Sequence, residues 1–240
     1  MTVLLQASGL SAGYGAAWMV QGLDLQVRRG EVVALMGRNG AGKSTTLKAL
    51  IGAVKRSGQV NFMGQDLSYT EPYQAARLGL GYVPEDRRIF TDLTVMDNLR
   101  VGQQAPRHWP DGQPAPLWTP ARLFELFPTL GAMTQRLGAR MSGGEQQMLS
   151  VARTLMGNPL VLLLDEPSEG VAPIVVEQMV QMIQALKTQG VSVLLSEQNM
   201  HFAALVSDRA YVLEKGRICY EGSMSALVAN DEVRRHYLGV

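Results

Sequence analysis

A glycine-rich loop between a predicted strand and a predicted helix constrains this chain more than any other feature. Residues 32–36 are all apolar, which predicts a buried strand, and residues 46–51 have the apolar spacing of a helix. The loop fits the pattern G-x-x-x-x-G-K-S over residues 37–44 without a mismatch. The flanking elements disfavour a chance match in a glycine-rich turn. The order of strand, loop and helix therefore indicates a site for a nucleoside triphosphate, but not how the nucleotide is used.

A triphosphate needs many hydrogen-bond donors close to a curved backbone, and the loop supplies them. Gly37, Gly40 and Gly42 allow unusual dihedral angles and a close approach of the backbone to the anion. The loop N–H groups and the start of the helix then face the phosphates. Lys43 adds a charge for the β- and γ-phosphates, and Ser44 offers a hydroxyl to Mg²⁺. The predicted nucleotide-binding residues of the loop are Gly37, Arg38, Asn39, Gly40, Ala41, Gly42, Lys43, Ser44 and Thr45.

The composition predicts a globular protein with few special partners. Of the 240 residues, 46% are apolar and 18% are charged, and the net charge of +1 argues against a nucleic-acid partner. The one cysteine, Cys219, excludes a disulfide framework or a cysteine-based metal site, and we expect it to be a small packed residue. No apolar run approaches the ~18 residues of a membrane span, and no signal peptide is visible at the start. We therefore expect a cytoplasmic chain that reaches a membrane only through a partner.

Segments with strand patterns alternate with segments of helical periodicity, which predicts a parallel α/β sheet. Strands are expected over residues 3–5, 23–27, 32–36, 57–64, 80–84, 160–167, 191–195 and 210–213. Helices are expected over residues 71–78, 94–99, 121–127, 129–137, 145–156, 175–187, 200–206 and 232–238. Residues 103–120 contain five prolines, which predicts a surface loop within a helical subdomain. Trp109 and Trp118 are expected to hold this loop to the body; the alternative is contact with a partner.

Two carboxylates follow an apolar run at the predicted end of a central strand. Open α/β sheets bind ligands at the carboxyl ends of their strands. There Asp165 can hold Mg²⁺ through its water shell, and Glu166 can position or deprotonate the attacking water. The alternative is an acidic strand end in a turn before Pro167. The glycine-rich loop elsewhere in the chain favours the functional interpretation.

A second candidate anion site opens the predicted helix near residue 145. The hydroxyl of Ser142 and the amides of Gly143 and Gly144 would lie at the N-terminus of that helix. The alternative is a capping box between Ser142 and Glu145, and both can hold at once. Two phosphate-binding loops in one chain suggest a head-to-tail dimer in which each loop faces the nucleotide of the partner.

These motifs together resemble those of ABC transporter ATPases, and the resemblance covers essentially the whole chain. Residues 37–45 are similar to the Walker A loop, residues 142–147 to the ABC signature and residues 162–166 to the Walker B strand. Tyr14, expected in a turn, resembles the aromatic residue that stacks on adenine; the alternative is a core tyrosine. The resemblance implies ATP and Mg²⁺ as ligands and Ser142, Gly143, Gly144 and Glu145 as contacts to nucleotide.

The resemblance also implies an α/β fold, the P-loop NTPase cassette of ABC proteins. This fold has a parallel-sheet core, an antiparallel β subdomain and a helical subdomain. We expect a single domain over residues 1–240. Within it, residues 1–84 and 158–222 would form the core with the β subdomain, residues 85–157 the helical subdomain with the signature, and residues 223–240 a C-terminal helical tail.

Closer detail resembles the LivF type, the second ATP-binding subunit of branched-chain amino acid importers. The residues that carry this resemblance are 83–90, 168–173, 196–199 and 233–239. Glu85 stands where most ABC proteins have the Q-loop glutamine, and it can accept from water or approach Mg²⁺. Gln198 stands at the switch-histidine position; its amide can donate to a γ-phosphate but cannot titrate near neutrality. The candidate catalytic residues are Glu166, Lys43, Gln198 and Glu85, and the candidate metal ligands are Ser44, Asp165 and Glu85.

By this resemblance the chain would hydrolyse ATP to energise amino-acid import, most simply of branched-chain amino acids. The implied partners are a LivG-like second ATPase or a second copy, two transmembrane permease subunits contacted by residues 85–99, and a periplasmic binding protein. The implied location is the cytoplasmic face of the inner membrane. Importers of urea, amides or aromatic acids remain open. Non-transport ABC ATPases usually carry two cassettes or a long coiled coil, and P-loop kinases and GTPases lack the signature.

Overall fold

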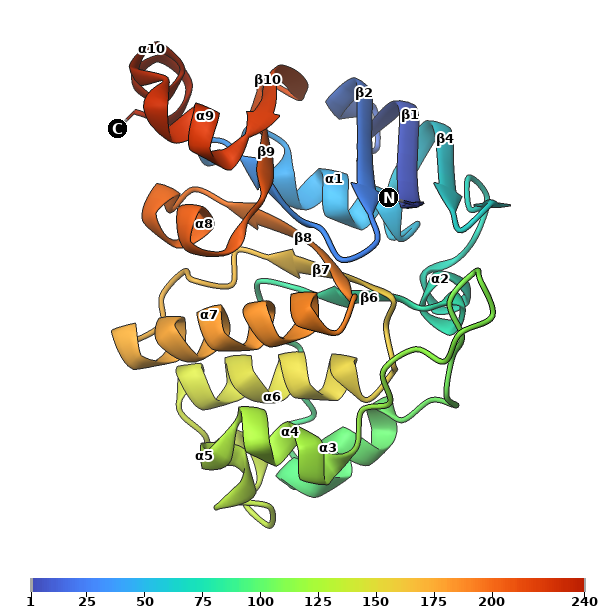
Figure 1. The fold of residues 1–240 in the computed structure, drawn as a ribbon, viewed down its shortest axis with the longest axis vertical. Helices are drawn as coiled ribbons and strands as arrows, with labels where there is room; N and C mark the ends of the chain where they lie inside the picture. Colours follow the sequence, from blue (N-terminus) through green and yellow to red (C-terminus); the bar gives the residue numbers. More distant parts are fainter. Residues whose placement is uncertain (1, 240) are drawn as a thin grey trace.

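Six strands form the central sheet of the computed structural model, in the order β10-β9-β3-β8-β7-β6 (Figure 1). The structure describes residues 2–239, so Met1 and Val240, the ends of the expected domain, lie outside it. The strands are β3 (Val32–Met36), β6 (Leu80–Val83), β7 (Val161–Asp165), β8 (Ser192–Glu197), β9 (Arg209–Glu214) and β10 (Arg217–Ser223). All pairings are parallel except that of β9 with β10. The predicted parallel core is confirmed.

Every residue of β3 and β7 is buried, as expected for central strands covered on both faces. Successive side chains point to opposite faces, so Val33 and Leu35 face one core and Val32 and Ala34 the other. Helix α1 (Lys43–Leu50) and the antiparallel sheet cover the first face. Helices α6 (Gly143–Leu155), α7 (Pro173–Thr188) and α8 (Met200–Val206) cover the second, as Figure 1 shows.

The second sheet is antiparallel, in the order β2-β1-β4-β5. Its strands are β1 (Val3–Tyr14), β2 (Ala17–Arg28), β4 (Lys55–Phe62) and β5 (Gln65–Asp66). The predicted strands 3–5 and 23–27 are therefore too short, and Tyr14 ends a strand rather than lying in the turn. Bulges interrupt the apolar–polar alternation, for example between Ala7 and Leu10, where Gly9 adopts a φ of +59°. Because of these bulges, the sequence of β1 and β2 does not alternate regularly between apolar and polar residues, so the full length of the strands is not visible in the pattern.

The remaining helices mostly follow the predicted pattern. They are α2 (Pro72–Leu78), α3 (Val95–Gly102), α4 (Pro120–Leu126), α5 (Pro128–Gly131), α9 (Met224–Ala229) and α10 (Asp231–Val233). A 3₁₀ turn spans Gly138–Arg140 and a π-helical turn spans Arg234–Leu238. The predicted helix 129–137 is wrong beyond Gly131, because the carbonyls of Thr134 and Arg136 accept from the first N–H groups of α3. Helix α9 lies within the predicted helical tail 223–240, although no separate helix was predicted at its position. Among the helices that the structure describes, none has the length and apolarity to cross a bilayer.

The proline-rich loop, residues 103–119, is held at two points, as predicted. Trp109 is buried in the core shared with the antiparallel sheet, and Trp118 is buried in the core on the opposite face of the central sheet. The guanidinium of Arg29 lies 4.2 Å from the ring centre of Trp109 and 2.7 Å from a carboxylate oxygen of Asp111. The loop therefore links elements that are distant in the sequence.

We expect Trp109→Ala to lower the free energy of unfolding by about 3–5 kcal/mol, because it removes a buried indole and leaves a cavity. Urea denaturation followed by circular dichroism measures the change. Leu117→Ala is the matched control, since Leu117 lies in the same loop with 46% of its surface exposed. Equal effects of the two substitutions would show that Trp109 does not hold the loop.

Candidate nucleotide-binding site

The glycine-rich loop leaves the carboxyl end of β3 and enters α1 directly. Gly42 precedes the helix with a φ of +109°, a conformation that side chains rarely tolerate. A Cβ atom on Gly37 would lie 2.6 Å from the carbonyl oxygen of Leu213. The tight approach of the loop to β9 therefore requires glycine. The loop also lies at the carboxyl end of β3 and at the N-terminus of α1, a place where backbone N–H groups can bind an anion.

A polar cavity of about 300 Å³ lies against this loop. It brings together eight of the predicted site residues, which are Asn39, Gly40, Gly42, Lys43, Ser44, Thr45, Glu85 and Glu166. Met19 and Glu169 also line it and were not predicted. Arg38 and Ala41 line a neighbouring cavity of about 250 Å³, together with Tyr237 of the C-terminal tail. The cavity therefore unites residues from β2, the loop, the segment after β6 and the segment after β7.

Lys43 and Glu166 form a buried ion pair at the floor of the cavity. The Lys43 Nζ lies 3.0 Å from Glu166 Oε1 and donates to the carbonyls of Gly37 and Arg38 at 2.9 and 3.2 Å. Lys43 is only 3% exposed. Burial alone would raise the pKa of the Glu166 carboxyl, but hydrogen bonds from Glu169 and Lys43 hold it below its ordinary value. Because they form this ion pair, Lys43 and Glu166 can both remain charged although both side chains are buried.

The backbone of Glu166 is strained. Its φ of +46° is rare for a side-chain-bearing residue and costs on the order of 1–3 kcal/mol. Its N–H donates to the carbonyl and to the hydroxyl of Ser196 on β8, both at 3.1 Å. The Gln198 Nε2 donates to Glu166 Oε2 at 3.3 Å, so the predicted switch residue contacts the predicted base. The strained turn aims the carboxylate at the loop instead of into the sheet.

Asp165 is 1% exposed, and both of its carboxylate oxygens accept hydrogen bonds from neighbouring strands. Ser196 Oγ donates to Oδ1 at 2.7 Å and Tyr82 Oη donates to Oδ2 at 3.0 Å. Burial, and the charge of Asp165, raise the pKa of the Tyr82 phenol, so it stays protonated and remains a donor. Tyr82 was not predicted as a site residue. The available signal was a tyrosine within a buried strand, whose hydroxyl needs a partner.

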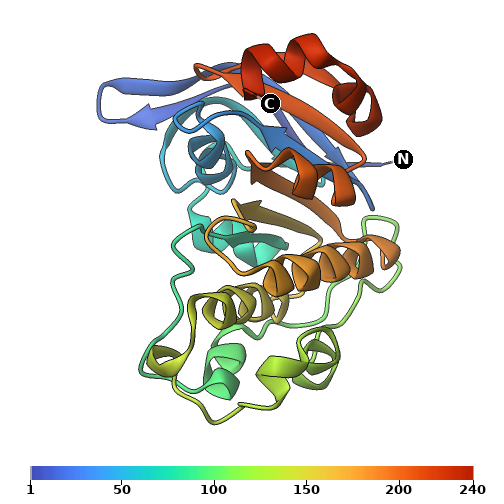
Figure 2. The same ribbon diagram turned by 90° about the vertical axis from the view of Figure 1, so that its left-hand side faces the viewer.

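The remaining predicted residues lie outside this cavity. Ser142, Gly143, Gly144 and Glu145 open α6, where Ser142 Oγ accepts from the Glu145 N–H and Glu145 Oε2 accepts from the Ser142 N–H at 2.7 Å. The predicted capping box between Ser142 and Glu145 is therefore confirmed. Tyr14 is 51% exposed near the tip of the β1–β2 hairpin, which projects from the molecule in blue in Figure 2. The alternative of a core tyrosine is wrong.

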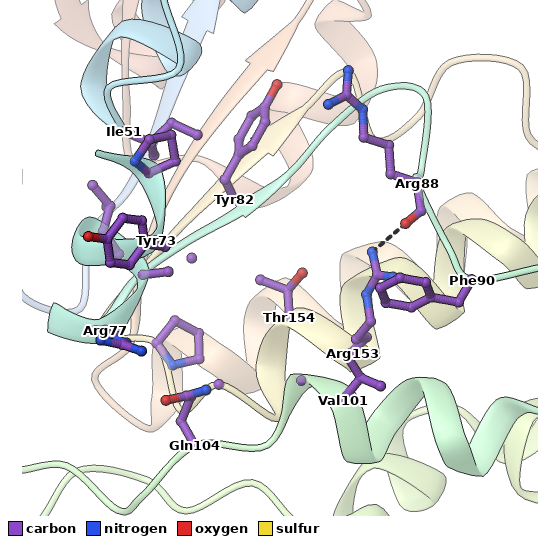
Figure 3. Close-up of a pocket in the computed structure, with 17 residues that line it drawn as sticks. Ile51, Tyr73, Arg77, Tyr82, Arg88, Phe90, Val101, Gln104, Arg153 and Thr154 are labelled. Atoms are coloured by element: carbon purple, nitrogen blue, oxygen red, sulfur yellow. Dashed lines mark hydrogen bonds between the residues drawn. The ribbon is translucent and has the colours of Figure 1, made fainter. Parts of the chain in front are cut away.

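A larger cavity, of about 540 Å³, forms a groove lined by α2, β6, the segment after β6, α3 and α6. Figure 3 shows Tyr73 of α2, Tyr82 of β6, Arg88 and Phe90 after β6, and Arg153 of α6 around it. Arg153 donates to the Arg88 carbonyl at 2.8 Å, the dashed line in the figure, and lies 5.1 Å from the ring centre of Phe90. The groove combines exposed apolar surface with guanidinium groups.

The fold and this site define an ATP-binding cassette, and comparison with known proteins agrees. The ABC transporter family matches residues 20–169, and the chain belongs to this family of ATP-hydrolysing proteins. It is 40% identical to the high-affinity branched-chain amino acid transport ATP-binding protein BraG of Pseudomonas aeruginosa, over 98% of this chain and all of that one. It is 34% identical to the lipopolysaccharide export ATP-binding protein LptB of Escherichia coli, over 98% and 97% of the two chains. A solved ATP-binding subunit of an ABC transporter superimposes with a TM-score of 0.80 at 28% identity, over 98% and 96% of the two chains.

The unpredicted Glu169 gives the site a pH dependence. Its hydrogen bond with Glu166, burial and the charges of Glu166 and Glu85 raise its pKa to about 7. A carboxyl whose pKa is raised on folding stabilises the fold in its protonated form, and this contribution is lost as the pH rises through about 7. The ordinary pKa is 4.5, so the loss falls between about pH 4.5 and 7. We therefore expect the melting temperature of the wild type to fall from pH 5 to pH 7 more steeply than that of Glu169→Gln.

Thermal melts at pH 5, 6 and 7 measure this difference. Glu177→Gln, on the exposed side of α7, is the matched control and should follow the wild type. Parallel pH profiles for the wild type and Glu169→Gln would contradict the shifted pKa.

Proposed function

We propose that this chain is the ATP-hydrolysing subunit of an importer of amino acids, with branched-chain amino acids as the favoured class. The observation that carries the chemistry is the single cavity in which the glycine-rich loop, Lys43 and Glu166 meet. The similarity to BraG supports the importer and the solute class. The similarity to LptB, at 34% identity against 40% for BraG, supports lipopolysaccharide export as a competing function. Import of urea, amides or aromatic acids is the alternative within the importers.

In this proposal the triphosphate lies along the N–H groups of the loop, and its γ-phosphate takes the place of Glu166 beside the Lys43 ammonium. A phosphate oxygen carries more charge than a carboxylate oxygen and competes well for a buried cation. Glu166 is then free to orient the attacking water and accept its proton. Gln198 already contacts Glu166, so its amide lies where it can also donate to the γ-phosphate.

The residues proposed to hold Mg²⁺ are Ser44, Asp165 and Glu85. Ser44 and Glu85 line the cavity, and Asp165 is a buried carboxylate at the adjoining strand end. Within residues 2–239 no three His, Cys, Asp or Glu side chains cluster as a metal site. This fits Mg²⁺, which uses one or two carboxylates together with substrate phosphates. When bound, the ion would neutralise charge on the β- and γ-phosphates.

The ATP site would be completed by a second cassette. Ser142, Gly143 and Gly144 are at least partly exposed at the start of α6 and away from the cavity of their own chain. In a head-to-tail dimer their amides would face the nucleotide of the partner, and Tyr14 would stack on adenine from the exposed hairpin. A LivG-like subunit is the proposed partner, and a second copy of this chain is the alternative. Residues 85–157 would then move as the helical subdomain.

The groove in Figure 3 is the proposed contact with the two transmembrane permease subunits. Phe90 and Val101 are exposed apolar residues at its rim, and Phe90 belongs to the segment 85–99 expected to meet the permease. Closure of the cassettes would thereby move the permease. A periplasmic binding protein would deliver the solute, and the chain would lie on the cytoplasmic face of the inner membrane.

We expect Glu166→Gln to retain ATP binding and to lose at least ~100-fold in turnover, since general-base catalysis typically contributes that much. Calorimetry measures the affinity, and phosphate release from the assembled transporter measures the turnover. Glu177→Gln makes the same chemical change on an exposed helix face and should behave as the wild type. Full turnover by Glu166→Gln would remove the role assigned to this residue.

The proposed partners predict what a tagged chain should retain when it is purified from native membranes. We expect mass spectrometry to identify a second ATPase and two hydrophobic permeases, with an untagged strain as the control. The attached binding protein can then be screened against branched-chain amino acids, urea, amides and aromatic acids. Ribosomes or DNA-repair proteins without a permease would overturn the transport role and leave the ATP chemistry intact.

A further inference from the structure

Tyr82 lies between the groove and the buried carboxylate of Asp165. Its ring lines the groove, and its hydroxyl lies 3.0 Å from Oδ2 of Asp165. Figure 3 shows the hydroxyl pointing away from the centre of the groove while the ring remains in its wall. One side chain therefore connects the groove to the carboxylate proposed to hold Mg²⁺.

Strand pairing explains this placement. Tyr82 on β6 is paired in parallel with Leu163 on β7. Side chains two residues apart on a strand share a face, so Asp165 lies on the same face as Leu163 and one step closer to the strand end. The phenol of Tyr82 is long enough to reach diagonally to that carboxylate. Three residues after Tyr82, Glu85 lines the nucleotide cavity, so the end of β6 contributes to both cavities.

The two donors to Asp165 fix the plane of its carboxylate. Ser196 on β8 holds Oδ1 and Tyr82 on β6 holds Oδ2, one from each neighbouring strand. A carboxylate that is almost fully buried needs such donors. The Ser196 hydroxyl lies within the core, whereas Tyr82 lies in the wall of an open groove. Of the two donors, Tyr82 is the one that a molecule in the groove can touch.

We propose that Tyr82 is a positioning residue that orients Asp165 for the nucleotide-bound cation and that communicates occupation of the groove by the permease to this carboxylate. The inference rests on the proposed function, because it takes Asp165 as a metal ligand and the permease as the occupant. Removing the hydroxyl leaves Oδ2 with one donor fewer and lets the carboxylate turn. Loss of such an outer hydrogen bond typically lowers metal affinity by about 10–100-fold.

The first test compares Tyr82→Phe with Tyr73→Phe in the isolated chain. Both remove a hydroxyl from a groove tyrosine, but Tyr73 is 58% exposed and belongs to α2, away from Asp165. Binding of Mn²⁺ in the presence of ATP is followed by electron paramagnetic resonance, and ATP binding in EDTA by calorimetry. We expect Tyr82→Phe to weaken Mn²⁺ about tenfold and to leave metal-free ATP affinity within about twofold, with Tyr73→Phe unchanged in both.

Equal Mn²⁺ affinity in the wild type and Tyr82→Phe would overturn the positioning role, and so would equal losses in the two variants. If the wild type binds ATP neither with Mn²⁺ nor in EDTA, the proposed function fails instead, so the two failures are distinguishable. Thermal melts identify a variant that has lost its fold. In that case Tyr82→Met, which also lacks the hydroxyl, replaces Tyr82→Phe in the same Mn²⁺ measurement, and unchanged affinity there also overturns the role.

The second test repeats the Mn²⁺ titration on the complex with the permease subunits. We expect Mn²⁺ affinity of the wild type to differ between the isolated chain and the complex, and this difference to shrink in Tyr82→Phe but not in Tyr73→Phe. No difference in the wild type, or the same difference in all three proteins, would overturn the communication between the groove and Asp165.

Discussion

Parallel pairing of β6, β7, β8 and β3 is the constraint on which the site depends. Strands that run in the same direction end at the same edge of the sheet, and open α/β sheets bind their ligands there. The loop after β3, the carboxylates after β7, Gln198 after β8 and Glu85 after β6 come from four distant parts of the sequence. They meet because each follows the carboxyl end of a strand. No antiparallel order of these strands would bring the four together.

The edge of the sheet also sets the electrostatics of the site. Lys43, Asp165 and Glu166 are buried there, and a buried charge needs a partner or several hydrogen bonds. Lys43 and Glu166 satisfy each other, while Asp165 relies on two neutral hydroxyls. In the proposed mechanism an arriving phosphate separates Lys43 from Glu166, while the two hydroxyls keep Asp165 in place. The strained backbone at Glu166 belongs to the same arrangement, because the turn directs the carboxylate toward Lys43.

Local motifs could be predicted from the sequence, and contacts across the sheet could not. The loop at Gly37–Ser44 and the capped start of α6 at Ser142 depend on neighbours within a few residues, so their patterns are visible in the chain. Tyr82 and Glu169 become part of the site only through strand pairing and through the turn after β7, which no local pattern shows. The long strands β1 and β2 were shortened in the prediction because bulges break their alternation. The helix predicted over residues 129–137 ends early because the carbonyls of Thr134 and Arg136 accept hydrogen bonds from the first N–H groups of α3.

The proline-rich loop joins two cores that the central sheet otherwise separates. Trp109 belongs to the core on one face and Trp118 to the core on the other, with eight residues between them. If one core unfolds, the short segment that is anchored in it is displaced, and this disturbs the tryptophan packed in the other core. Proteins commonly unfold in separate cooperative units, but a link of this kind merges two such units into one. Two of the three tryptophans of the chain are therefore expected to report the loss of both cores as a single fluorescence transition.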